Sequence, residues 1–109
     1  MEQTEFLDQN VFTDLTNLNE GDDAATNPHF SEADFEIVLQ RAAHFGLGVY
    51  TMETRLDGKD NAVVSHGDSN KKATDPRWYT WAFKTSKSRQ PGLTYSATYK
   101  VSGKLLAKE

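Results

Sequence analysis

The sequence of 109 residues contains no cysteine, which excludes disulfides, cysteine-ligated metal sites and thiol nucleophiles. It also contains no apolar run close to the roughly 18–20 residues that a membrane-spanning helix needs. The first residues, MEQTEFLDQNVF, are acidic where a secretory signal is basic and then apolar. We therefore expect a soluble, cytoplasmic protein.

Specific catalytic and cofactor motifs are missing from the sequence as well. The three histidines, His29, His44 and His66, do not have the spacing of metal ligands. Ser65 and His66 are adjacent, and neighbours on a strand point to opposite faces, so they do not form a nucleophile and its base. No glycine-rich loop resembles a phosphate-binding loop. The sequence therefore argues against an enzyme and predicts no cofactor and no metal.

Basic residues are almost missing from the first part of the chain. Residues 1–46 contain ten Asp and Glu and one base, Arg41, which gives a net charge of −9. Residues 47–109 contain eleven Lys and Arg and six Asp and Glu, which gives +5, and the two values sum to the −4 of the whole chain. Such a split indicates an interaction surface, although opposite halves also attract each other within one folded monomer.

A helix is predicted from about residue 32 to 45. Ser31 is a typical capping residue, and Asp34, three positions later, is placed to bond back to its backbone. Gly46 ends the run as a left-handed stop. The apolar positions recur at three- and four-residue steps, as one face of a helix requires: Phe35, Val38, Leu39 and Ala42.

Four segments after this helix have the composition of strands. They are GVYTMETRL, AVVSH, RWYTWAFKT and LTYSATYKV. Asp57-Gly58 predicts a hairpin between the first two. In the first segment, Tyr50 and Met52 are expected on one face. The sequence thus predicts a single small α+β domain: an antiparallel meander of about four strands over residues 31–109, packed with one main helix, after an acidic, partly ordered arm over residues 1–30.

The polar face of this predicted sheet offers one possible binding site. Alternation in RWYTWAFKT places Trp78 on that face, beside Lys84 and Lys100. An aromatic ring next to cations on an open sheet is typical of modules that bind single-stranded nucleic acid. The flanking cations available for phosphate contacts are Lys71, Lys72, Arg77, Lys87 and Arg89. The alternative interpretation is an ordinary solvated sheet face.

The acids concentrate in NEGDDAATNPHFSEADFE, residues 19–36. Duplex DNA carries about one negative charge per 1.7 Å of its axis, and carboxylates on an ordered backbone imitate that surface. Glu32 and Glu36 lie one helical turn apart, so their side chains emerge about 6 Å apart. The alternative interpretation is that these acids complement a helix dipole and solvate a linker. The residues predicted to bind a basic partner are Asp14, Glu20, Asp22, Asp23, Glu32, Asp34 and Glu36.

A small, acidic, cysteine-free chain with its carboxylates gathered in one half resembles the bacterial DNA-mimic proteins, including the Neisserial ones. The resemblance lies in the charge layout of the whole chain and in residues 19–36. It implies a non-enzymatic protein that binds a basic DNA-binding protein, such as an HU-like nucleoid protein, and competes with DNA for it. The basic half, residues 47–109, departs from the all-acidic pattern of these proteins.

Overall fold

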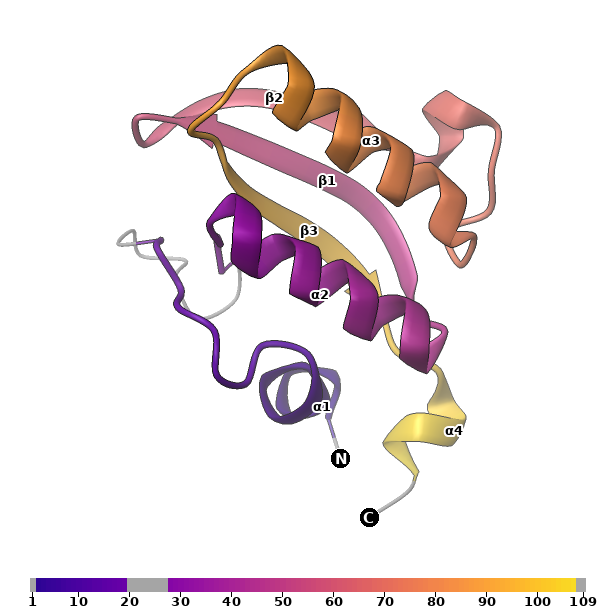
Figure 1. The fold of residues 1–109 in the computed structure, drawn as a ribbon. Helices are drawn as coiled ribbons and strands as arrows, with labels where there is room; N and C mark the ends of the chain where they lie inside the picture. Colours follow the sequence, from indigo (N-terminus) through magenta and orange to yellow (C-terminus); the bar gives the residue numbers. More distant parts are fainter. Residues whose placement is uncertain (1, 20–27, 108–109) are drawn as a thin grey trace.

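A three-stranded antiparallel sheet in the order β2-β1-β3 organises the computed structural model, which describes residues 2–19 and 28–107. Helices α2 and α3 lie side by side on one face of this sheet, and α1 lies next to α2 (Figure 1). The α+β class is therefore confirmed. The elements are α1 Gln3–Asn10, α2 Glu32–Phe45, β1 Gly48–Leu56, β2 Lys59–Ser65, a 3₁₀ turn His66–Ser69, α3 Pro76–Arg89, β3 Thr94–Lys100 and α4 Gly103–Leu106.

Helix α2 begins and ends where the sequence predicts. The Ser31 side chain accepts a hydrogen bond from the backbone N–H of Asp34, which caps the first turn. Gly46 adopts φ 66°, a left-handed conformation, and its N–H bonds to the last turn. The Asp34 carboxylate accepts the N–H of Thr16 (3.2 Å), so it links the arm to the start of α2.

Strands β1 and β2 form the predicted hairpin. Asp57 and Gly58 have φ values of 52° and 79°, and positive φ at both central residues is what a tight hairpin turn requires. A register shift between Val49 and Thr51 in the pairing of β1 with β3 changes one prediction. Tyr50 does not share the buried face of Met52 and is 41% exposed, because the extra residue of a bulge turns outward.

The segment RWYTWAFKT is helical, so the prediction of a strand there was wrong and the sheet has three strands instead of about four. The side chain of Asp75 caps the helix by accepting from the N–H of Arg77, and Pro76 occupies the first turn. Because helical periodicity replaces alternation, Trp78 does not lie on a polar sheet face as predicted. Trp78 is 1% exposed, and Trp81 is 57% exposed.

The core lies between the sheet and the two long helices. The Tyr95 ring of β3 stacks on Phe35 of α2 (centroids 5.3 Å apart) and meets Phe83 of α3 edge-on (5.0 Å). The described part of the arm also belongs to this core. Phe6 and Val11 are buried, and the Phe6 ring packs edge-on against Phe45 at the end of α2. The arm is therefore packed into the domain as far as residue 19.

Candidate functional site

The N-terminal arm is held along the outer edge of β3. Phe30 and Tyr95 exchange two backbone hydrogen bonds of 2.8 Å. Further along the strand, the Gln3 side chain donates to the carbonyl of Tyr99 (2.9 Å) and accepts the N–H of Val101 (3.0 Å). These bonds fix α1, and with it the first acids of the chain, against the sheet.

Arg41 is the one base among residues 1–46, and it also holds the arm. Its guanidinium donates to the carbonyls of Val11 (2.9 Å) and Thr13 (2.7 Å). The cation is therefore engaged with main-chain oxygens in the middle of the acidic half. The described residues between 2 and 46 contain no other Lys or Arg that could pair with the surrounding acids.

Helix α1 carries acids that the sequence prediction did not include. Glu2 directly precedes its first turn without a capping side-chain bond, and Glu5 and Asp8 follow at three-residue intervals; all three are exposed. Phe6 and Leu7 are buried on the other side of the helix. The signal was present in the sequence, because acids at positions i, i+3 and i+6 share one side of a helix.

The predicted row of acids is only partly assembled. Asp14 is exposed in a turn with φ 66°, and Asp34 lies on the side of α2 that contacts the arm. Glu36 lies on the other side of α2, where it lines a groove facing α3. Glu32 is close enough to Tyr95 that burial, reinforced by this carboxylate, raises the pKa of Tyr95 to about 12. Glu20, Asp22 and Asp23 lie outside the described residues.

The groove between α2 and α3 brings the two halves of the chain together. It has a volume of about 310 Å³, with Glu36 on one wall and Lys84 and Lys87 on the other. The Lys87 ammonium lies 5.2 Å from the centre of the Phe83 ring at its floor. Side chains of opposite charge from the two halves of the chain therefore line one groove.

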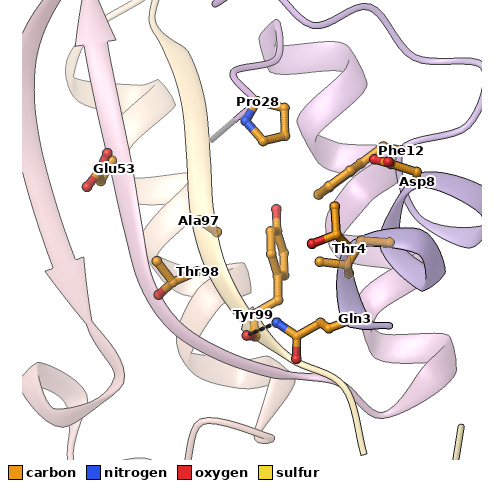
Figure 2. Close-up of a pocket in the computed structure, with 10 residues that line it drawn as sticks. Gln3, Thr4, Asp8, Phe12, Pro28, Glu53, Ala97, Thr98 and Tyr99 are labelled. Carbon is orange, nitrogen blue, oxygen red and sulfur yellow. Dashed lines mark hydrogen bonds between the residues drawn. The ribbon is translucent and has the colours of Figure 1, made fainter. Parts of the chain in front are cut away.

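A second cavity, of about 390 Å³, lies between α1, Pro28 and the edge of β3 (Figure 2). The carboxylates of Asp8 and Glu53 lie on its wall. Tyr99 projects into its centre in Figure 2, and the hydroxyl is buried without a hydrogen-bond partner among the described residues. Burial raises the pKa of Tyr99 far above its usual value, so the hydroxyl stays protonated. The cavity thus combines an apolar wall with acceptor groups of negative charge.

The residues predicted to bind nucleic acid are not brought together. Trp78 is buried against His66 (centroids 6.4 Å apart) and Tyr79 (6.1 Å), so its ring is not free to stack on a base. Lys84 lies on α3, and Lys100 ends β3. Of the flanking cations, Arg77 forms an ion pair of 2.7 Å with Asp75. Hydrogen bonds from the Arg77 side chain and backbone lower the pKa of Asp75 to about 2.

Comparisons with known proteins add no assignment. No protein family, no curated protein and no solved structure matches this chain. Among residues 2–19 and 28–107, no cluster of His, Asp and Glu is suited to hold a metal ion. The helices of that same part are all too short or too polar to cross a membrane.

Proposed function

We propose that this protein binds a basic DNA-binding protein, HU-like in its chemistry, and competes with DNA for it. The binding surface is the acidic face, which we define as Glu2, Glu5, Asp8, Asp14 and Asp34. The observation that carries the proposal is the engagement of Arg41 with the carbonyls of Val11 and Thr13. Because the one base of this half bonds to main-chain oxygens, it forms no ion pair with the carboxylates of the acidic face within the described residues.

The spacing of the acids on α1 supports the comparison with DNA. Residues three apart on a helix are separated by about 4.5 Å along its axis. Glu2, Glu5 and Asp8 therefore present carboxylates at an interval close to the roughly 3.4 Å between charges along one DNA strand. They lie on a helix that is fixed to the sheet by Gln3, so the charges are held in place before a partner arrives.

The cavity beside α1 gives the acidic face a place for one basic side chain. The stem of a lysine or arginine would pack on Phe12 and Pro28, and its charged end would meet Asp8. A buried carboxylate–guanidinium contact of this kind is stronger than a pair on an open surface. The other two acids of α2, Glu32 and Glu36, are left out of the proposed surface.

Binding to a purified HU-like protein tests the proposal. The triple variant Glu2→Gln, Glu5→Gln, Asp8→Asn removes three charges and keeps the shape of α1. We expect it to weaken the complex by about tenfold or more in calorimetry, and to lose competition with duplex DNA. Raising the salt concentration should weaken the wild-type complex, because exposed charges are screened beyond about 8–10 Å.

The control removes charge from the other side of α2. The variant Glu32→Gln, Glu36→Gln also removes acids from residues 1–46, but these two acids lie outside the acidic face. It should bind almost as the wild type does. Equal losses in the two variants would mean that only net charge matters, and no binding by the wild type at low salt would refute the proposal.

A further inference from the structure

The strand β2 leaves one edge of the sheet open. Tyr95 directs its backbone groups away from β1, because they bond to Phe30. Thr54 is the residue of β1 that lies opposite Tyr95. The backbone N–H and C=O of Thr54 therefore point toward β2, and those of Met52 do the same. Alternation then points the N–H and C=O of Val63 outward, where the described residues supply no neighbouring strand. The next outward N–H, that of Ser65, is taken by the Asp68 carboxylate (2.9 Å).

An apolar groove runs along this edge under α3. Its volume is about 270 Å³, and Ala62 and Val64 of β2 form one wall, with Trp81 and Thr85 of α3 on the other. Trp81 is 57% exposed and Val63 is 63% exposed. A single exposed apolar residue needs no explanation, but a tryptophan and a valine beside an unpaired strand mark a site where another strand adds.

We propose that the occupant is a second copy of this chain, paired antiparallel through β2 about a two-fold axis at Val63. In that register Val63 meets its own copy, and Ala62 lies opposite Val64. The charged residues at the start of the strand, Lys59 and Asp60, fall opposite Gly67 and His66. No like charges face each other, and residues 61–65 are uncharged. The two sheets then form one continuous sheet with both α3 helices on the same face.

Charge at the ends of the groove favours this partner. Helix α3 runs opposite to β2, so that Arg89 lies near the hairpin where β2 begins, whereas Asp68 follows directly after β2 ends (Figure 1). A two-fold axis at the middle of β2 brings the beginning of one strand next to the end of the other. Arg89 of each copy therefore meets Asp68 of the other copy. The groove of each copy thus contributes one arginine and one aspartate, and the dimer contains two equivalent ion pairs.

Sedimentation of the full chain over a range of concentrations tests the dimer. We expect the average mass to rise toward twice the monomer value as the concentration increases. Val63→Lys should raise the dissociation constant by about tenfold or more, because two lysines would then face each other across the axis. Gln9→Lys, on an exposed position of α1 away from β2, is the control and should leave the equilibrium unchanged.

Reversal of the charge at Arg89 separates this geometry from a general effect on folding. Arg89→Glu should weaken the dimer, whereas Arg89→Lys, which keeps the charge, should leave it nearly unchanged. A wild-type protein that stays monomeric at every concentration overturns the proposal, as does a dimer that Val63→Lys does not weaken. Quenching of Trp81 by a single-stranded oligonucleotide without a change in mass would assign the groove to nucleic acid and also overturn it. The dimer does not depend on the acidic face.

Discussion

The two edges of the sheet are built in opposite ways. The edge of β3 is closed by the main chain of Phe30 and by the side chain of Gln3. Within residues 2–19 and 28–107, the edge of β2 is bordered by an apolar groove and not by another strand, and it carries Val63 with its backbone groups turned outward. Edge strands attract other strands unless something covers them, so the fold protects one edge and leaves the other available.

The difference teaches that the N-terminal arm has a structural role besides its charge. The primary amide of Gln3 has one donor and one acceptor facing β3, as a peptide group has, and it takes the place of a missing strand residue. The same arm presents Glu2, Glu5 and Asp8 to solvent. Closing an edge and displaying carboxylates are therefore two results of one placement of α1.

The largest expected effect comes from removing the side chain that anchors the closed edge. Phe30 is 1% exposed, and Phe30→Ala should lower the free energy of unfolding by about 3–5 kcal/mol, as truncation of a buried phenylalanine does. Denaturant unfolding followed by circular dichroism measures this change. Val63→Ala, on the open edge, should alter stability by no more than about 0.5 kcal/mol at concentrations where the chain is monomeric. Similar losses at both edges would remove the contrast.

Alkaline pH should destabilise the fold through tyrosines that are buried in its core. Burial raises the pKa of Tyr95 on β3 and of Tyr79 on α3 to about 12, whereas β2 contains no tyrosine. Both groups are neutral in the folded protein, and an unfolded chain ionises its tyrosines near pH 10. The stability they contribute is therefore complete below pH 10 and is lost as the pH rises toward 12.

Unfolding midpoints measured across this range, together with tyrosinate absorbance, test the expectation. The absorbance should lag behind that of a denatured control until the fold opens. A stability that stays constant from pH 9 to 12 would show that these hydroxyls are not buried as described. Tyr79→Phe and Tyr95→Phe should each remove part of the pH dependence.

A smaller effect is expected from Gln3. Gln3→Ala removes both hydrogen bonds to the edge of β3 and should cost about 1–3 kcal/mol, since a buried carbonyl and N–H lose their partners. Gln3→Glu should cost at least as much, because a carboxylate cannot donate to the Tyr99 carbonyl. Gln9→Ala, on the exposed side of the same helix, is the control and should be nearly neutral. Equal effects of the Gln3 and Gln9 substitutions would show that the edge is not closed by this side chain.

The least perturbing comparison uses amide hydrogen exchange and no mutation. The Tyr95 N–H is bonded to Phe30 and should exchange slowly. The Val63 N–H should exchange much faster in dilute solution, where no second strand covers it. Slow exchange of Val63 that persists as the protein is diluted would contradict an open edge in the monomer.

Much of the fold was predictable because local signals agreed with the final structure. Ser31 and Gly46 mark the ends of α2, and both cap it as expected. Asp57-Gly58 forms the hairpin turn, and Tyr95 and Tyr99 of β3 are buried as their alternation indicates, although Ser96 between them is buried as well. At these positions the residue type, the periodicity and the turn chemistry all favour the same structure.

The prediction failed where two periodicities fit the same residues. Tyr79 and Phe83 are buried either as alternate strand positions or as neighbours on a helix, so they did not distinguish the two. Aromatic residues favour strands, which made the strand more attractive. The decisive signal was Asp75-Pro76, a capping residue followed by a proline in the first turn, and it was overlooked.

The closure of the β3 edge had no local signal in the sequence. Gln3 and Tyr99 are 96 positions apart, and a glutamine near the N-terminus carries no mark of a long-range contact. The position of Glu36, on a different side of α2 from Asp34, also had no local signal in the sequence. Whether Glu36 faces the solvent or Lys84 depends on where α3 packs, and α3 was itself misassigned.

The anchoring of the arm by Arg41 gives the acidic face an unusual response to ionic strength. The guanidinium is bound to main-chain carbonyls, which carry dipoles but no net charge, and not to a carboxylate. Dissolved salt screens such a short charge–dipole contact far less than it screens exposed ions. A salt titration can therefore switch off attraction to a cationic partner while the carboxylates of α1 stay in place. The loss of binding at high salt therefore reports the screened attraction between the two proteins and not a loss of structure in the acidic face.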